Sequence, residues 1–443
     1  MEQIKSAKKA HSAPLVKVPP SGQKPSRNLA PRDVEKLADE LVSYHEQYAD
    51  LYKRREQREW AEFYLKGQLS DLERKTVEPM VLASKGRDIN AIRAAQQFLG
   101  EGTWDDQAIL KRREKLVAQD LGETDGVLIC DGSGFPKKGA YSVGVARQYC
   151  GALGKIANCQ QGVFLGYVSS RGHTFIDRRL YLPKHWFGDE YAEKRKRCGV
   201  PKDAKFQTEP ALALEMVSDV AKGEQLPFQW VVADEHYGMN PEFLDGIDAL
   251  GKCYFVEVPK NTMVWPEDVK IIPLGKGPMG APRKGPRVAP GTKAQEVRQI
   301  GAQLSTNDWK RHTIKEGSKG PITADFAFVR ARSKRRRRPG HEVWVIFRRG
   351  LEPGAEIKYY LSNAPVRCPR TTLARMSGLR WPIETTLEEG KSELGMDHYE
   401  TRTWRGWHHQ MTLTFLAHHF LLRMRLRFQK KPGADTRASQ GLN

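Results

Sequence analysis

The segment GVLICDGSGFPKKG, residues 126–139, decides the fold of this chain. Its first half is a short apolar run that ends at Asp131, and a glycine-rich stretch follows, which is typical of a buried strand leading into a turn. A second apolar run, FQWVVADEHYG (228–238), carries Asp234 at its end. Because ligands of α/β sheets bind beyond the carboxyl ends of the strands, both aspartates are candidate functional residues. Taken singly, each is equally well explained as a turn acid, and Glu235 competes with Asp234.

The runs around these two segments predict a mixed α/β sheet with helices. The expected strands are 142–149, 162–170, 173–183, 253–260, 322–333, 341–349 and 357–363, and the expected helices are 208–223, 240–251 and 405–428. Residues 261–300 are dense in Gly, Pro and Lys, so we expect a long exposed loop there.

Residues 31–122 predict a small all-helical domain before the sheet. Its first helix is expected to begin at Asp33 as the N-cap, with an apolar stripe that reaches Leu51. A capping box formed by Ser70 and Glu73 predicts a second helix. The remaining helices are expected over Asp88–Gly100 and Thr103–Gly122.

Composition limits the partners of the chain. With 73 Lys and Arg against 53 Asp and Glu, the net charge is +20, and nucleic acid is the polyanion that best offsets this self-repulsion. The alternative is a merely basic protein. Six cysteines without a C-x-x-C pair predict reduced thiols in a cytoplasmic setting. The most apolar stretch, 411–428, is interrupted by histidines and arginines, which favours a buried helix over a membrane span.

A third candidate acid lies on a helix expected over 381–396. Glu384 is at the edge of the apolar stripe of this helix, one turn after Arg380 and two turns before Lys391. The alternative is an ordinary solvated helix in which Glu388 pairs with Lys391.

Asp131, Asp234 and Glu384 together predict a three-carboxylate site for hard divalent cations. Mg²⁺ prefers oxygen ligands and keeps several waters, so carboxylates and substrate phosphates suit it. Two such ions about 4 Å apart activate the attacking oxygen and stabilise the leaving oxygen in a phosphoryl displacement. Arg380 and Lys391 would then hold a DNA backbone beside the ions.

These segments resemble the DDE-type transposases of prokaryotic insertion sequences, which have a ribonuclease H-like catalytic domain related to retroviral integrases. LICDGSGFPKKG resembles the segment of the first catalytic aspartate, which maps to Asp131, and WVVADEHYG resembles that of the second, Asp234. The stretch between them, LYLPKHWFGDEYAEKRKRCGVPKDAKFQTEPALALEM, is also similar to the family. The resemblance covers about residues 35–428.

RWPIETTLEEGKSELGMDHYETRTWRGWHHQMTLTFLAH, residues 380–418, is similar to the closing signature of this family. The signature is tyrosine, two residues, arginine, three residues, glutamate, six residues and lysine. Arg380, Glu384 and Lys391 match its last three terms. Ser377 takes the place of the tyrosine, a departure that affects a phosphate contact and not the three carboxylates.

The resemblance also implies how the chain is divided. The 149 residues between Asp234 and Glu384 exceed what a ribonuclease H fold needs, and the excess resembles the β-rich insertion of hairpin-forming relatives. The expected segments are a disordered basic tail (1–30), a helical DNA-binding domain (31–122), the catalytic core (123–260 and 371–404), the β-rich insertion (261–370), and a C-terminal helix with a tail (405–443).

The resemblance implies a transposase that acts on double-stranded DNA. It would hydrolyse transposon ends with two Mg²⁺ ions, for which Mn²⁺ substitutes, and the freed 3′-hydroxyl would attack target DNA without a covalent protein intermediate. By analogy with relatives we expect a homodimer in a synaptic complex, in the bacterial cytoplasm with the nucleoid. The rival readings are a catalytically silent DNA-binding protein and a structure-specific nuclease of the same fold.

Further DNA contacts are expected outside the three acids. The expected DNA-binding residues are Arg380, Lys391, Lys137, Lys138, Lys334, Arg335, Arg336, Arg337, Arg338 and Trp265. The run 334–338 is expected at a hairpin tip, with a merely solvated tip as an equal alternative. Trp265 is a candidate for stacking on a flipped base, although packed tryptophans are commoner. Two histidine pairs, 408–409 and 418–419, are too far apart to share one metal ion.

Overall fold

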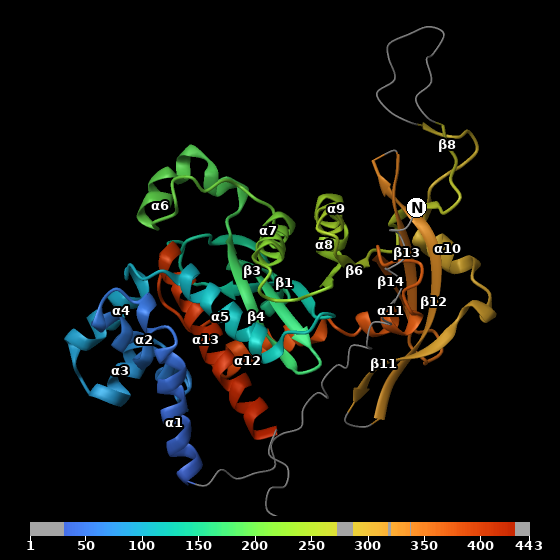
Figure 1. The fold of residues 1–443 in the computed structure, drawn as a ribbon. Helices are drawn as coiled ribbons and strands as arrows, with labels where there is room; N and C mark the ends of the chain where they lie inside the picture. Colours follow the sequence, from blue (N-terminus) through green and yellow to red (C-terminus); the bar gives the residue numbers. More distant parts are fainter. Residues whose placement is uncertain (1–30, 273–286, 318–319, 337, 430–443) are drawn as a thin grey trace, which may run out of the picture.

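A computed structural model describes residues 31–272, 287–317, 320–336 and 338–429. It has the mixed α/β fold that the sequence predicts, built on one large sheet (Figure 1). The strand order is β10-β7-β12-β13-β14-β6-β5-β1-β3-β2, with β11 beside β12 and β4 beside β3. The expected basic tail, 1–30, and the residues after 429 lie outside the described part of the chain.

The strands come from two parts of the chain. The first part holds β1 (Val127–Pro136), β2 (Ala146–Cys150), β3 (Lys155–Ser169), β4 (Gly172–Tyr181), β5 (Trp230–Ala233) and β6 (Cys253–Val258). The second holds β7 (Met263–Pro266), β10 (Gln295–Glu296), β11 (Lys310–Gly317), β12 (Gly320–Arg335), β13 (Arg338–Arg349) and β14 (Ile357–Ser362), while β8 (Ile271–Ile272) and β9 (Arg287–Val288) pair separately. Because β14 pairs with β6, both parts form one continuous sheet.

Helices precede the sheet, connect its strands and close the chain. The first group is α1 (Pro31–Glu46), α2 (Arg55–Gln68), α3 (Val77–Lys85), α4 (Ile89–Gly100) and α5 (Asp106–Leu121). The connecting helices are α6 (Ala192–Arg197), α7 (Glu209–Gly223), α8 (Glu235–Gly238), α9 (Pro241–Ala249) and α10 (Val297–Gln303). The closing helices are α11 (Arg370–Met376), α12 (Trp381–Ser392) and α13 (Trp404–Gln429).

The sheet lies between two layers of helices, and alternate side chains of β1 pack against each layer. Val127 and Ile129 pack in one core with residues of α12 and α13, whereas Leu128 and Cys130 pack in a second core with residues of α7 and α9. A strand that is buried on both faces reads as a continuous apolar run, which explains why the sequence shows no polar alternation there.

The expected turn after Asp131 is wrong, because β1 continues to Pro136 in antiparallel pairing with β3. What ends near Asp131 is the parallel pairing with β5, whose last pair is Cys130 with Ala233. The neighbouring glycines serve close packing and do not form a turn. A Cβ on Gly134 would lie 2.8 Å from Cys150 Sγ.

The helical segment differs from its prediction in several places. The predicted N-cap Asp33 is wrong, because α1 begins at Pro31. The helix expected from Thr103 begins at Asp106, with Asp105 as its N-cap.

The Ser70 capping box is wrong, because the Ser70 hydroxyl donates to the Gly67 carbonyl after the end of α2, and the next helix begins after Thr76. Helix α2 was not expected, since charged residues interrupt its apolar stripe. By contrast, the predicted start at Asp88 is confirmed, with the side chain accepting a hydrogen bond from the backbone of Ala91.

The expected long loop over 261–300 is also wrong where the structure describes it, because β7, β8, β9, β10 and most of α10 lie there. Residues 273–286 are outside the described part. The predicted strands at 322–333, 341–349 and 357–363 are confirmed, and β11 adds an unexpected antiparallel neighbour to β12. Short pairings such as those of β7 and β10 depend on strands far away in sequence, so no local pattern predicts them.

Helix α13 is the predicted terminal helix, and it explains the most apolar stretch of the chain. Trp407 and Phe415 pack in a core with the sheet, while Leu416 and Phe420 pack with the N-terminal helices. Figure 1 shows α13 between the blue helices and the strands. The helix is therefore apolar on both sides because it joins two cores. Within the described residues, no helix is both long and apolar enough to cross a membrane.

Buried Arg113 ties α5 to the sheet and to α13. Its side chain is fully buried, and its guanidinium donates to the carbonyls of Phe415 and Phe175 at 3.1 and 2.7 Å and to the Thr174 hydroxyl at 2.9 Å. Three segments far apart in sequence thus share one donor group. Removing it would leave buried carbonyl groups unpaired.

We therefore expect Arg113→Met to lower the free energy of unfolding by about 2–4 kcal/mol in urea denaturation. Arg112→Met is the matched control, because the adjacent Arg112 is half-exposed and pairs with Asp50, which is 65% exposed. It should lose less than about 1 kcal/mol. Equal losses in the two variants would contradict a structural role for the buried guanidinium.

Candidate functional site

An open cleft of about 1130 Å³ lies where the parallel pairing of β1 with β5 ends. Its lining includes Asp131, Asp234 and Glu384, together with Arg380 and Lys391. The structure thus brings the three predicted acids and the two predicted basic partners into one cleft, although they span more than half of the chain.

The two aspartates are placed by the sheet. Asp131 directly follows Cys130, and Asp234 directly follows Ala233, which is the last residue paired with Cys130. The backbone N–H of Gly132 donates to Asp131 Oδ1 at 2.8 Å. Asp234 is the N-cap of α8 and accepts a hydrogen bond at 2.9 Å from a backbone N–H of its first turn. The two carboxylates therefore lie at neighbouring inner strands, directly after the last parallel pair.

The environment of Asp131 disfavours the charged form of its carboxyl in the absence of a bound cation. Burial raises the pKa of its carboxyl to about 7, and the negative charges of Asp234 and Glu384 add to this increase. The charge of Arg380 and the hydrogen bond from Gly132 oppose it. The charged form of Asp131 is thus disfavoured unless further positive charge enters the cleft.

Glu384 is engaged by Arg380. The arginine Nη2 and Nε both donate to Glu384 Oε1, at 2.6 and 2.9 Å, across one turn of α12. In the described part of the chain, no three His, Cys, Asp or Glu side chains form a ready-made metal-binding group. The third acid therefore shares the cleft with the two aspartates while its oxygen binds an arginine.

The other predicted lysines occupy different positions. Lys391 lines the cleft, and its ammonium donates to the Gly134 carbonyl at 3.3 Å. Lys137 turns away to Tyr399, with its Nζ 3.5 Å from the ring centroid, and burial lowers its pKa to about 8. Lys138 is exposed outside the lining of the cleft. Of these three lysines, only Lys391 belongs to the lining of the cleft.

The predicted basic tip lies at the β12–β13 turn, away from the residues that line the cleft. Arg335 pairs with Asp245 there, at 2.7 Å. Lys334 and Arg336 lie beside it and Arg338 follows, whereas Arg337 is outside the described residues. Trp265 is only 8% exposed in β7, so its ring packs in this conformation, and a stacking role stays a prediction.

Sequence reasoning missed a fourth carboxylate, Glu209. A Cβ on Gly132 would lie 3.3 Å from Glu209 Oε2, and the cleft lining also includes Glu209, His236 and Tyr237. Burial raises the pKa of Glu209, and the charge of Asp234 raises it further. An acid in the first turn of a helix is ordinary, so the sequence carries no signal for this contact. Glu235, the predicted competitor, is not part of the lining.

The four histidines of α13 are packed inside the protein. His408, His409, His418 and His419 are all buried in α13, and burial lowers the pKa of each. Their ring nitrogens form hydrogen bonds with protein groups. His418 Nε2, for example, is 3.1 Å from Glu389 Oε2. All four histidines are packing residues.

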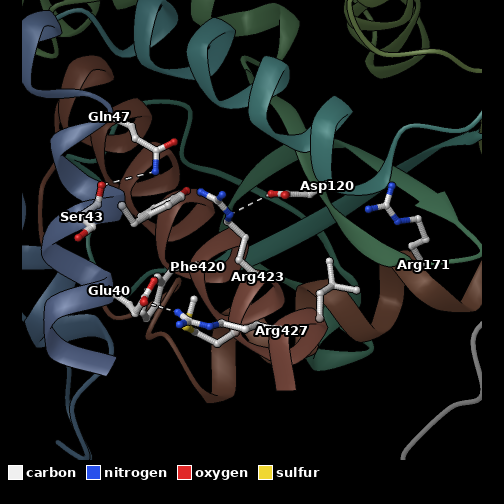
Figure 2. A pocket seen from close by; sticks show the side chains of 11 residues that line it. Glu40, Ser43, Gln47, Asp120, Arg171, Phe420, Arg423 and Arg427 are labelled. Carbon is white, nitrogen blue, oxygen red and sulfur yellow. Dashed lines mark hydrogen bonds and ion pairs between the residues drawn. The ribbon is translucent and has the colours of Figure 1, made fainter. Parts of the chain in front are cut away.

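A second cavity, of about 370 Å³, lies between α1, α5 and α13 (Figure 2). Arg423 pairs with Asp120 at 3.1 Å, and Arg427 pairs with Glu40. Figure 2 shows these pairs bridging the helices around the cavity. Since acids already partner these two arginines of α13, the cavity is best explained as part of the contact between helices.

A protein-family model matches this chain. Residues 47–321 match a family model described as DDE superfamily endonuclease. That match covers more than half of the chain, so this protein belongs to the DDE superfamily of endonucleases.

A curated relative and a solved structure are also similar. The probable transposase for insertion sequence element IS701 of Microchaete diplosiphon is 25% identical over 335 residues, which is 75% of this chain and 74% of the relative. The NurA nuclease from Sulfolobus solfataricus is similar over 66% of this chain and 86% of its own, at 11% identity and a TM-score of 0.27. That structural likeness is too low to support an argument.

The raised pKa of Asp131 leads to a pH-dependent stability. Because this pKa is about 7 in the folded protein and 3.8 ordinarily, the metal-free protein loses stability as the pH rises from about 4 to 7. We expect Asp131→Asn to raise the free energy of unfolding above pH 7 by about 1–3 kcal/mol in metal-free buffer, and the gain to vanish near pH 4. Glu388→Gln, an exposed acid of the same cleft, should change it by less than about 0.5 kcal/mol. A destabilised Asp131→Asn protein above pH 7 would contradict the analysis.

The Arg380–Glu384 pair leads to a prediction for metal binding. The two side chains are 39% and 46% exposed, so their interaction is worth about 1 kcal/mol. Arg380→Gln should therefore tighten Mn²⁺ binding to the DNA-free protein by about fivefold in calorimetric titration.

Two variants control this experiment. Arg405→Gln removes the same charge outside the cleft, where Arg405 donates to a carbonyl of the helical segment, and it should leave Mn²⁺ binding unchanged. Adding Glu384→Gln to Arg380→Gln should abolish the gain. Weaker binding in Arg380→Gln alone would show that the arginine does not compete with metal.

Proposed function

We propose that this protein is a DNA transposase that cuts transposon ends and joins the freed 3′-hydroxyl to target DNA. The observation that carries the proposal is the placement of Asp131 and Asp234 directly after the last parallel pair of β1 and β5. The cleft that they share with Glu384, Arg380 and Lys391 supports it. The strand order β4-β3-β1-β5-β6, with the last three parallel, also supports a ribonuclease H-like core.

The residues of the cleft suit magnesium. Asp131, Asp234 and Glu384 supply carboxylate oxygens, the donors that Mg²⁺ prefers, and the pKa of Asp131, which burial and Asp234 raise, would fall again beside a bound cation. We propose that these three acids hold two Mg²⁺ ions, with Mn²⁺ as a substitute. When bound, the ions would activate the attacking oxygen and stabilise the leaving oxygen.

The basic residues of the cleft would hold the DNA. Arg380 presents a planar guanidinium that is matched to phosphate oxygens, and Lys391 presents an ammonium on the same helix. A phosphate that binds Arg380 would release Glu384 from its ion pair. In this proposal, DNA binding and completion of the three-acid site are therefore coupled through one arginine.

The proposal also assigns partners and segments. Its substrate is double-stranded DNA, both the transposon end and the target, and two copies would meet in a synaptic complex in the cytoplasm. We propose that the helices of 31–122 contact DNA outside the cleft and that the strands of 261–370 form the insertion. The pairing of β14 with β6 supports an insertion that is held rigidly to the core.

A cleavage experiment tests the proposal. With Mg²⁺ and DNA that carries the sequences flanking the coding region, the protein should cut and join strands. Asp131→Asn and Asp234→Asn should each reduce cleavage by about a thousandfold or more, because each removes an anionic oxygen from the metal site. Glu235→Gln is the matched control, since Glu235 lies next to Asp234 but outside the cleft lining, and it should cut normally.

The outcomes distinguish a transposase from a catalytically silent DNA-binding protein and from a structure-specific nuclease. If the unmodified protein and Asp131→Asn bind the DNA but are equally inactive, the protein is a catalytically silent DNA-binding protein. If acid-dependent cuts occur on branched DNA without any joined product, it is a structure-specific nuclease.

A further inference from the structure

The β2–β3 hairpin carries an exposed apolar tip, which we define as residues 149–156. Tyr149 is 65% exposed, Ile156 is 61% exposed and Leu153 is 46% exposed. Tyr149 and Ile156 are direct cross-strand partners, so their side chains stand next to each other. Three large apolar side chains on one short turn are an unfavourable surface in water unless they meet a partner.

The tip is part of the wall of the acid-lined cleft. Tyr149, Gly151 and Ala152 belong to the same lining as Asp131 and Asp234. β2 is the last strand of the sheet, so one of its edges is open. The partner of the tip would therefore lie beside the candidate active site.

The base of the hairpin is fixed to the strand that carries the first acid. Cys150 packs against Gly134 of β1, where a Cβ would lie 2.8 Å from the sulfur. Asn158 donates through Nδ2 to the Lys137 and Gly139 carbonyls at 2.7 and 3.0 Å. These contacts hold the tip at a constant position relative to Asp131, which suits a surface that positions a substrate.

The segment that forms the tip carries only positive charges, which suits a polyanion. No Asp or Glu occurs between Asp131 and Asp177, a run of 45 residues (132–176). Exposed Arg147 precedes the tip and exposed Lys155 lies within it. A protein partner that covered the apolar side chains of the tip would not require positive charges alone around them. A nucleic acid strand does require positive charges beside apolar side chains, because it presents apolar base faces next to phosphates.

We propose that the hairpin tip binds unpaired bases of the DNA strand at the cut site, with Tyr149 stacking on a base. This inference rests on the proposed function and adds a recognition surface to the same cleft. Base faces are buried in an intact duplex, so the tip would select DNA that is open next to the scissile phosphate. Arg147 and Lys155 would contact the backbone on either side.

The test compares two labelled probes in metal-free buffer, a blunt duplex and the same duplex with one splayed end. We expect the unmodified protein to bind the splayed probe more tightly, and Tyr149→Ala to weaken that binding by about tenfold while changing blunt-duplex binding by less than about twofold. Tyr149→Phe keeps the ring and should bind like the unmodified protein. A 2-aminopurine in the splayed strand should be quenched only when a ring is present at position 149.

Tyr141→Ala is the matched control, because Tyr141 is also exposed, at 60%, but lies outside the cleft lining. It should leave both affinities unchanged, and the melting temperature of each variant should confirm that it folds. Equal affinity of the unmodified protein for the two probes would overturn the proposal, as would an equal loss on both probes in Tyr149→Ala. A change of oligomeric state in Tyr149→Ala would also overturn it and would identify a second copy as the partner.

These measurements need no cleavage. Failure of the transposase proposal would appear as inactivity with an intact preference for splayed DNA. Failure of the hairpin proposal would appear as normal cleavage without that preference.

Discussion

The parallel pairing of β1 with β5, which ends at Cys130 and Ala233, is the constraint on which the rest of the molecule depends. Both strands are buried between two helical layers, so a one-residue slip would turn the apolar side chains of β1 into the wrong core. The register therefore cannot adjust to relieve the repulsion between Asp131 and Asp234. Packing buries Asp131 and holds it beside Asp234, and both the burial and the neighbouring negative charge raise the pKa of Asp131. A site of this kind gains stability when a cation enters.

The cation already at the site is an arginine. Arg380 pairs with Glu384 and also faces the two aspartates electrostatically, so it partly balances a cleft lined by several acids. This arrangement depends on α12, which packs against the sheet through Ile383. The α12 position depends in turn on α13, which is buried between the sheet and the N-terminal helices. Helices α12 and α13 and the N-terminal helices, which lie far from them in sequence, thus together determine where Glu384 lies relative to Arg380 and the two aspartates.

Charge is distributed unevenly around this centre. The carboxylates converge where the parallel pairing of β1 with β5 ends, while residues 132–176, which include the β2–β3 hairpin, carry only positive and neutral side chains. A polyanion that contacts the hairpin therefore meets no acid of this segment, and cations would neutralise the acids of the cleft beside it. This distribution of charge also gives the exposed aromatic side chain of Tyr149 a chemical setting that suits nucleic acid.

The sequence by itself determined the α/β class, most strands and helices of the sheet, the two aspartates after apolar runs, and the arginine–glutamate–lysine spacing on α12. These features are local, because periodicity, caps and apolar runs act over a few residues. Only the tertiary structure decided that β1 runs on past Asp131, that β14 joins the two halves of the sheet, and that Glu209 approaches Gly132. It also decided that Glu384 binds Arg380 and that Lys137 turns away from the cleft. These contacts depend on which distant surfaces pack together, and no stretch of sequence contains that information on its own.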